Sequence, residues 1–427
     1  MGVLRRFEER IDTEVLANYA AQLAANPQGF GRRVVSSRVP GARPRWQSAT
    51  VMPALRVEAE QLSAADVAEL LDDEVSMLPD PHCDPGWRLT ALSDSDGGTI
   101  VLTWLHHAYG DGRGILETAF DPRAVSEDPP PTSAARPIRE MEEVIGRVRQ
   151  GVRGGVRLGR EAATAGWRQP HSDLARLRPA LGALRARDRS VGGRSQRRML
   201  ATARVAAADW DRVAAARGGS GNALLVAVLA NLLRGARLAR GEVLDRPLRL
   251  MLPFDTRLAS GSHAAAQAPG NAAGAAMITM AAGPPAHGSL EAVRAAIREA
   301  LREASAAMAP ASPHRPPRPP GVVDAMQLLP DSITHRVASR VQAQVDGVAS
   351  NVGPIPAHVA HLGSHTASEV FLLAGPMRTD LTVCLGRDRT HVALGVVADP
   401  ARLGPIGGLR ERVAQELSAW ELAPELR

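Results

Sequence analysis

The stretch WLHHAYGDGRG, residues 104–114, places His106 and His107 side by side, shortly before an aspartate that has a glycine on each side. A neutral imidazole can take a proton from a hydroxyl or an amine near pH 7 and return it later in the reaction. The composition predicts roughly 0.002 chance matches to the pattern H-H-x-x-x-D-G in a chain like this one. The motif is therefore the first candidate for chemistry, and the alternative is a loop with two solvated histidines.

The segments on both sides of the motif are expected to hold it in place. TIVLTWLHH (99–107) is rich in β-branched and apolar residues and predicts a strand, and GILETAF (114–120) predicts the start of a helix. The two histidines then stand at the end of a strand, before a glycine-rich turn. A rigid element of this kind is the right support for a reactive side chain.

Strand and helix signals alternate along most of the chain. Further strands are predicted at 32–39, 197–206, 246–257, 275–282, 371–375, 381–386 and 391–397, and helices at 12–25, 208–217, 218–240, 290–308 and the C-terminus. Residues 126–198 differ, because they form a proline-rich and then arginine-rich linker without a strand signal. The pattern predicts an α/β (α+β) fold with mixed sheets, an N-terminal lobe at 1–125 and a C-terminal lobe at 199–427.

The charge of the chain fits an anionic partner. All 51 basic residues are arginine and the formal net charge is +6, although the absence of lysine also looks like a coding bias. Coenzyme A phosphates, an acidic carrier protein and a lipid surface are all compatible with this charge. Nucleic acid is disfavoured, because aromatic residues make up only 3% of the chain and no reader motif is present.

The remaining composition predicts a cytoplasmic protein that is at most peripheral to a membrane. Cys83 and Cys384 have neither metal-ligand spacing nor the pattern of a disulfide framework. The N-terminal residues lack the apolar core of a signal peptide, and the apolar run at 223–233 is too short to span a bilayer. The arginine-rich segment 137–198 is expected to be a solvated helical face, with a lipid-surface helix as the alternative.

HHAYGDG resembles the active-site motif of the condensation and acyltransferase superfamily built on the chloramphenicol acetyltransferase fold. Further blocks resemble the bacterial wax ester synthase/diacylglycerol acyltransferase branch in the same order: DPGWRLTAL (84–92), GNALLVAVLANLLR (221–234), LMLPFDTR (250–257), PGNAAGAAMITM (269–280), SNVGPIP (350–356) and RTDLTVCLGRDRTHVALGVVAD (378–399). The resemblance covers most of the chain from about residue 10. Three features depart from it: Asn222-Ala223 replaces an Asn-Asp pair, the opening segment is largely absent, and SNV is followed by Gly-Pro rather than by Pro-Gly-Pro.

The resemblance implies two chloramphenicol acetyltransferase-like lobes with an active-site channel between them. It implies transfer of an acyl group from acyl-CoA to an alcohol of the fatty alcohol or diacylglycerol type, without a metal, a cofactor or a covalent enzyme intermediate. His107 is the implied general base, and His106 is implied to be structural. Gly110 and Gly112 bring the turn backbone close to the site.

Asp111 is implied to hold the loop through an ion pair with a distant arginine rather than to serve in a triad. Arg257, at the end of LPFDTR, is the candidate partner, and Arg113 and Arg378 compete with it. An unpaired buried carboxylate would be strongly destabilising, which favours such a pair.

An oxyanion that develops on the acyl group needs a hydrogen-bond donor beside it. Four polar residues stand inside otherwise apolar blocks and are candidates for this role or for substrate contact: Asn222, Asn271, Ser350 and Asn351. The alternative is that they cap helices or complete turns. The sequence GGSG (218–221) is a weak candidate for a phosphate cradle, and His358, His361 and His365 are expected to be solvated loop histidines rather than metal ligands.

Two other functions stay open at this stage. The acyl donor could be held on a carrier protein, as in condensation reactions of natural-product biosynthesis, with an alcohol or amine acceptor. Alternatively, the chain could be a non-catalytic relative that binds lipid or a carrier protein. The intact HHAYGDG motif argues against the last possibility, and Ala223 is the change that favours it.

Overall fold

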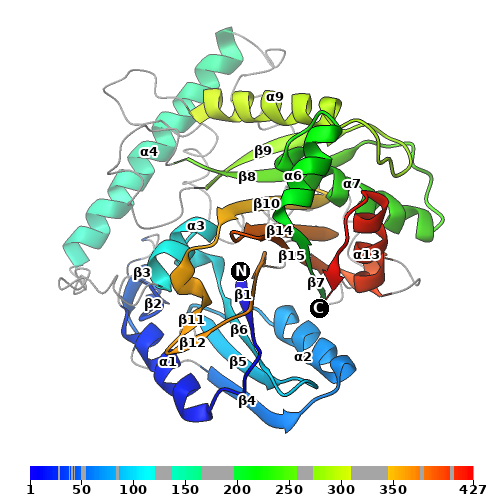
Figure 1. The fold of residues 1–427 in the computed structure, drawn as a ribbon. Helices are drawn as coiled ribbons and strands as arrows, with labels where there is room; N and C mark the ends of the chain where they lie inside the picture. The colour runs from blue at the N-terminus through cyan, green and yellow to red at the C-terminus, as the bar shows by residue number, and fades with distance from the viewer. Residues whose placement is uncertain are drawn as a thin grey trace.

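A computed structural model describes residues 1–26, 29–37, 39, 42, 44–49, 54–82, 86–120, 137–164, 197–256, 273–308, 345–375, 379–403 and 408–426. Figure 1 shows two sheets, one in the lower and one in the upper half of the view, with helices packed around them. The predicted α/β class with two lobes and mixed sheets is confirmed.

The first lobe is built on a five-stranded sheet in the order β13-β1-β6-β5-β4. Its strands are β1 (Gly2–Phe7), β4 (Ala54–Gln61), β5 (Trp87–Ser93), β6 (Thr99–Leu105) and β13 (Glu369–Leu373). Only the β4–β5 pair is parallel. Every residue of β6 is buried, as expected for a central strand with both faces covered.

Two helices cover the two faces of this sheet. α1 (Thr13–Ala25) packs its buried Leu16, Tyr19 and Leu23 into one hydrophobic cluster. α2 (Ala64–Ser76) begins with a capping box between Ser63 and Asp66 and packs into a second cluster on the other face. A separate hairpin of β2 (Arg32–Val35) and β3 (Arg45–Ser48) lies beside this lobe.

The second lobe is built on a seven-stranded mixed sheet in the order β16-β7-β15-β14-β10-β8-β9. Its strands are β7 (Met199–Ala206), β8 (Leu248–Asp255), β9 (Ala273–Met280), β10 (Gly347–Pro354), β14 (Leu381–Arg387), β15 (His391–Ala398) and β16 (Glu425–Leu426). Its helices are α6 (Ala207–Ala216), α7 (Gly221–Ala239), α9 (Glu291–Met308), α12 (Pro400–Leu403) and α13 (Leu409–Ala419).

α7 is the central helix of the second core. Among the described residues it alone is long and apolar enough to cross a membrane by length and composition, and 72% of the relevant window is buried inside the protein. Its side chains from Ala223 to Leu233 are all buried. Burial inside the second lobe accounts for the apolar composition of this helix.

One strand of the first sheet comes from a distant part of the chain. β13 comes from the C-terminal half of the chain, yet it pairs with β1 in the first sheet, where Figure 1 draws it in orange beside the blue strand. β13 also packs closely on β15, because a Cβ atom added at Gly395 would lie 2.2 Å from the Leu372 carbonyl oxygen. A simple division of the chain into an N-terminal and a C-terminal part therefore does not separate the two sheets.

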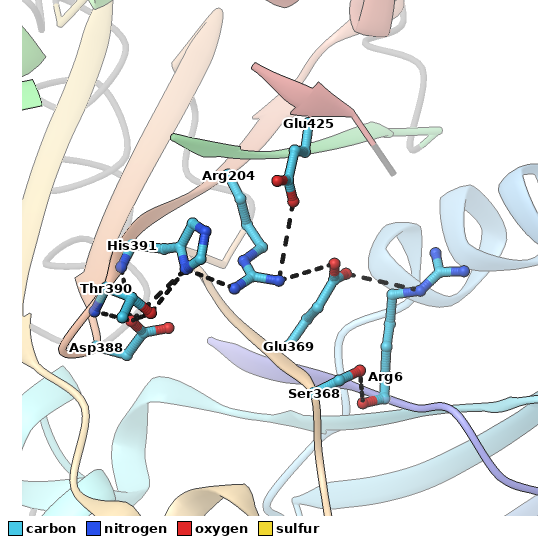
Figure 2. Close-up of polar contacts among 8 residues, drawn as sticks. All are labelled: Arg6, Arg204, Ser368, Glu369, Asp388, Thr390, His391 and Glu425. Carbon is cyan, nitrogen blue, oxygen red and sulfur yellow. Dashed lines mark hydrogen bonds and ion pairs between the residues drawn. The ribbon is translucent and has the colours of Figure 1, made fainter. Parts of the chain in front are cut away.

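Charged side chains join the lobes around Glu369 on β13 (Figure 2). Arg204 on β7 lies 3.0 Å from one carboxylate oxygen of Glu369, and Arg6 on β1 lies 3.8 Å from the other. Arg204 also contacts Nδ1 of His391 at 2.7 Å. This network ties β1 and β13 of the first sheet to β7 and β15 of the second. Its central carboxylate, Glu369, is only 5% exposed.

A second connection runs from α2 to β7. The Asp72 carboxylate accepts the Leu200 N–H at 2.7 Å, and the Ser76 hydroxyl oxygen accepts the Arg198 N–H at 2.6 Å. Burial raises the pKa of Asp72 to about 6, against the opposing effects of the Leu200 hydrogen bond and of Arg410 and Arg197. The interface therefore contains a carboxyl group that titrates near neutral pH.

The observed elements match most of the predicted ones to within a few residues. The helix expected in the arginine-rich linker is α4 (Pro137–Thr164), which runs without a break through its glycines. The segment after the motif differs from a plain helix, because a short α3 (Gly112–Gly114) leads into a π-helical turn at Ile115–Ala119. The elements that were not predicted include β1, β3, β4, α2, β5 and β10.

Candidate active site

The histidine motif follows the end of β6 directly. The His106 N–H donates to the Gly86 carbonyl oxygen at 2.7 Å, which continues the pairing of β6 with β5 by one residue. A 3-10 turn at His107–Tyr109 follows, and Tyr109 is buried beneath it. Its hydroxyl accepts from the Gly86 N–H at 2.8 Å and donates to the Arg32 carbonyl oxygen at 2.7 Å. These bonds hold the turn on the sheet edge.

His107 presents an exposed side chain in a crowded part of the surface. Burial among neighbouring atoms lowers the pKa of His107 below its usual value near 6.5, while the charge of Asp111 raises it to a smaller extent. A lowered pKa favours the neutral ring near pH 7, so His107 is suited to accept a proton.

His106 has a different environment. Its Nδ1 accepts the Ala108 N–H at 3.1 Å and so caps the 3-10 turn. Burial, followed by the positive charges around it, lowers the pKa of His106, which keeps the ring neutral and able to accept this bond. The side chain is folded back on the loop that carries His107.

Asp111 is 5% exposed, and its Oδ1 accepts the Gly114 N–H at 2.8 Å, which caps α3. Its effect on the pKa of His107 is that of a nearby charge. Arg113, one of the possible partners, pairs instead with Glu117 at 2.7 Å. The candidate partner Arg257 and its competitor Arg378 lie outside the described residues, so the expected ion pair stays a prediction.

Gly112 brings the motif against the second lobe. A Cβ atom at this position would lie 3.2 Å from a methyl group of Val352 on β10, so any larger residue would push the loop away. Gly110, which is buried, closes the preceding turn by donating its N–H to the His107 carbonyl oxygen at 3.4 Å. The loop of His107 therefore packs against the end of β10.

β10 is irregular at the same place. Its pairing with β14 shifts register between Asn351 and Gly353, and Gly353 has a φ of +82°, which favours glycine. Beyond this bulge, a cavity of about 150 Å³ lies between β10 and the helix that follows the motif. Its lining residues are Arg113, Leu116, Glu117, Val352, Pro354, Ile355 and Pro356.

Two of the polar candidates come together at this bulge. The Asn351 side-chain amide donates to Oδ1 of Asn222 at 2.5 Å, and Oδ1 of Asn351 accepts the Gly353 N–H at 2.9 Å. Asn222 lies in the first turn of α7, whose N-cap is Ser220. Because its oxygen is occupied, the Asn222 amide nitrogen is the group left to donate to a ligand.

The other two polar candidates do not join this pair. Ser350 pairs in register with Cys384 on the neighbouring strand β14, and burial raises the pKa of the Cys384 thiol to about 12. Asn271 lies outside the described residues. Ala223, at the position where the resemblance implies an aspartate, is fully buried in the second core.

The weaker candidates have structural partners. His358 contacts the Leu116 carbonyl oxygen at 2.7 Å, His361 contacts the Thr366 hydroxyl at 3.0 Å, and His365 contacts Glu9 at 2.5 Å. No group of three or more potential metal ligands occurs in the described part of the chain.

The GGSG turn (218–221) is engaged within the fold. The Gly218 and Gly219 N–H groups bond to the end of α6. Cβ atoms added at these two glycines would collide with Glu291 and Leu290, respectively. The turn is thus packed against the start of α9.

Sequence reasoning missed two residues that shape this site. Tyr109 supports the histidine turn from below, and Cys384 is the register partner of Ser350. Tyr109 stands within the histidine motif, and its aromatic side chain is the signal that could have marked it as a buried support for the turn. Nothing near Cys384 in the sequence points to the Ser350 contact, because it depends on the pairing of β10 with β14.

No family model matches the sequence, and no curated protein matches it either. Solved structures do match its fold. The wax ester synthase/diacylglycerol acyltransferase from Marinobacter aquaeolei VT8 is 17% identical with a TM-score of 0.55, covering 98% of this chain and 93% of that one. The first condensation domain of the CDA synthetase is 15% identical with a TM-score of 0.52, covering 98% and 88%. The condensation domain of a Monacolin K polyketide synthase is 14% identical with a TM-score of 0.51, covering 98% and 90%. The chain therefore has the two-lobed fold of condensation domains and of this wax ester synthase over nearly its whole length.

Proposed function

We propose that the protein is an acyltransferase that moves an acyl group from coenzyme A to an alcohol, with His107 as the general base. The observation that carries the proposal is the placement of His107, whose exposed side chain stands on a loop that packs against β10, the strand that holds Asn351. The fold shared with a wax ester synthase and with condensation domains supports the same reaction class.

The reaction follows from these groups. A ring nitrogen of the neutral His107 takes the proton of the alcohol, and the alcohol oxygen attacks the thioester carbonyl carbon. The amide nitrogen of Asn222 donates to the oxyanion that forms, while Asn351 holds that amide in place. The C–S bond then breaks, and the departing thiolate receives the proton from His107. The proton, the acyl group and both electron pairs are accounted for by these steps.

The acceptor is proposed to be a lipid alcohol such as a fatty alcohol or diacylglycerol. The resemblance of the blocks along the second lobe supports this choice. The cavity of about 150 Å³ beside the histidine loop offers Leu116, Val352 and Ile355 to an alkyl segment, with Arg113 and Glu117 also in its lining.

A carrier-protein-bound donor is the second candidate. Two of the three structural matches above are condensation domains, and Ala223 replaces the aspartate of the wax ester synthase pattern. Coenzyme A and a carrier protein present the same pantetheine arm, so both donors suit one channel. An amine acceptor would fit the same base.

The deciding experiment supplies both donors. Purified protein is incubated with palmitoyl-CoA and hexadecanol or diacylglycerol, and in parallel with a palmitoyl-loaded carrier protein, with His107→Ala as the control. Ester formed from the CoA thioester by wild type alone supports the proposal. Product from the loaded carrier, with none from CoA thioesters of any chain length, promotes the second candidate. Binding of lipid or carrier without any turnover would identify a non-catalytic relative.

A further inference from the structure

α4 carries a row of apolar side chains that face solvent. Six of its residues lie three or four positions apart, so they form one stripe along the helix. We call this the α4 stripe: Ile138, Met141, Ile145, Val148, Val152 and Val156. Their exposed fractions run from 44% for Ile145 to 75% for Ile138, and the stripe is about 27 Å long at 1.5 Å per residue.

The rest of the helix shows which side faces the protein. Val144, Gln150 and Gly151 are buried or half-buried, and Glu140 bonds to Ser37 at 2.8 Å and to Arg45 on the β2–β3 hairpin. The stripe lies on a different side of the helix from these contacts. In Figure 1, α4 runs along the outer edge of the molecule, away from both sheets.

Arginines border the stripe on its solvent side. At 100° per residue, Arg149 and Arg153 stand next to the stripe and Arg139 stands beyond them. All three are exposed, and they have no ion pair among the described residues. Glu142 is the one carboxylate on the same side. The border is therefore positively charged.

The composition of α4 makes it dependent on such a contact. It contains five glycines within 28 residues, at positions 146, 151, 154, 155 and 159. Each glycine inside a helix is unfavourable relative to alanine, because glycine loses more conformational entropy on folding. A helix that contains these glycines and leaves its apolar face exposed to water is only weakly stable, and burial of that face would stabilise it.

We propose that α4 docks the protein on the surface of an anionic lipid bilayer, with the α4 stripe among the acyl chains and the arginines at the headgroups. An amphipathic helix with a strongly basic border and low overall hydrophobicity has the properties of an interfacial helix. Anionic lipid complements the arginines. A second copy packed stripe to stripe would instead bring two arginine-rich borders to one interface.

Vesicle flotation tests this without any substrate, so its result is separate from that of the proposed reaction. The probes are vesicles of phosphatidylcholine alone and of phosphatidylcholine mixed with phosphatidylglycerol. The wild type is expected to float with the mixed vesicles, and more weakly with phosphatidylcholine alone or at high salt. The double variant Val148→Asp/Val152→Asp is expected to lose flotation, and Arg149→Gln/Arg153→Gln to bind the mixed vesicles roughly 30-fold less tightly.

The matched control is Val243→Asp, which changes a valine that is 77% exposed and lies outside α4. It should float like the wild type, and all variants should keep the wild-type thermal unfolding midpoint. The proposal is overturned if the wild type ignores the mixed vesicles or if Val243→Asp abolishes flotation as completely as the stripe variant. A wild-type dimer in sedimentation that the stripe variant converts to a monomer, without vesicle binding, would assign the stripe to a second copy.

Discussion

Asn351 on β10 donates a 2.5 Å hydrogen bond to Asn222 at the start of α7, across 129 positions of sequence. The contact orients the Asn222 amide so that its nitrogen is free to donate. It also joins the strand that packs on the histidine loop to the helix at the centre of the second core. The start of α7 and the bulge in β10 thus together position the Asn222 amide as a hydrogen-bond donor.

Asn222→Ala is expected to lower kcat by about 100-fold to 1000-fold, the usual loss when one oxyanion donor is removed. Asn351→Ala should lower kcat by less, because it only releases the Asn222 side chain. The double variant should be no worse than Asn222→Ala alone, since both changes remove one interaction. Steady-state kinetics of the three variants measure this, and fully multiplicative losses would contradict the coupling.

His107→Ala is expected to reduce turnover by about 100-fold to 10,000-fold, because it removes the general base. The thermal midpoint should hardly change, because the side chain is exposed. His106→Ala should retain more activity, since it removes only a cap on the turn. Wild-type turnover in His107→Ala would rule out the mechanism.

The pH dependence of kcat/KM should follow the lowered pKa of His107. The protonated ring is inactive, so kcat/KM should rise with pH through a value below 6.5 and be level at pH 7 and above. Burial of the ring, the largest cause of the shift, disfavours the protonated form and therefore lowers the pKa. A rate profile for the free enzyme that still rises between pH 7 and pH 8 would contradict this assignment.

Asp72→Asn should stabilise the protein at alkaline pH. Because its pKa is raised from 3.8 to about 6, the folded state favours the protonated form, and stability is lost as pH rises from 3.8 through about 6. The amide oxygen can still accept the Leu200 N–H. Thermal melts should show a higher midpoint for the variant at pH 8 and a small difference below the unfolded pKa of 3.8, where both unfolded and folded carboxyls are largely protonated. A lower midpoint at pH 8 would show that Arg410 and Arg197 outweigh burial.

Asp111→Ala should lower both stability and activity, because it removes the cap of α3 and a charge near His107. Loss of such a cap alone lowers the free energy of unfolding by about 1 kcal/mol. If Arg257 is the partner of Asp111, Arg257→Ala should have a similar effect and the double variant should lose little more. Additive losses in denaturant unfolding would remove Arg257 from consideration.

The sequence predicted the elements that carry a strong local pattern. β6, β7, α7 and α9 lie close to their expected positions, because long apolar or amphipathic runs determine them. β1, with its sequence GVLRRF, was not predicted because two adjacent arginines interrupt the apolar pattern. In the fold, Arg5 is fully buried and hydrogen-bonds to Tyr19 and Thr103. A buried arginine cannot be distinguished from a surface one by periodicity.

The site was predictable in its residues and less so in its connections. The histidine motif identified His107, but its packing on Val352 depends on a tertiary contact between lobes. Asn222 and Asn351 stood out as polar residues in apolar blocks, yet only the fold joins them. Ser350 had the same sequence signal, but it lies opposite Cys384 in the β10–β14 pairing. A polar residue in an apolar block was therefore enough to identify a candidate, but only the pairing of strands and helices in the fold shows which candidates come together.

The late position of β13 in the chain has a consequence for synthesis on the ribosome. β1 emerges long before its neighbour β13, which ends only at Leu373, so one edge of the first sheet stays open while the intervening residues are made. At 5–20 residues per second this delay is about 20–75 s. An open apolar edge can pair with other nascent chains. Slower translation or scarce chaperones should therefore reduce the soluble yield, and two separately expressed halves should each be aggregation-prone until mixed.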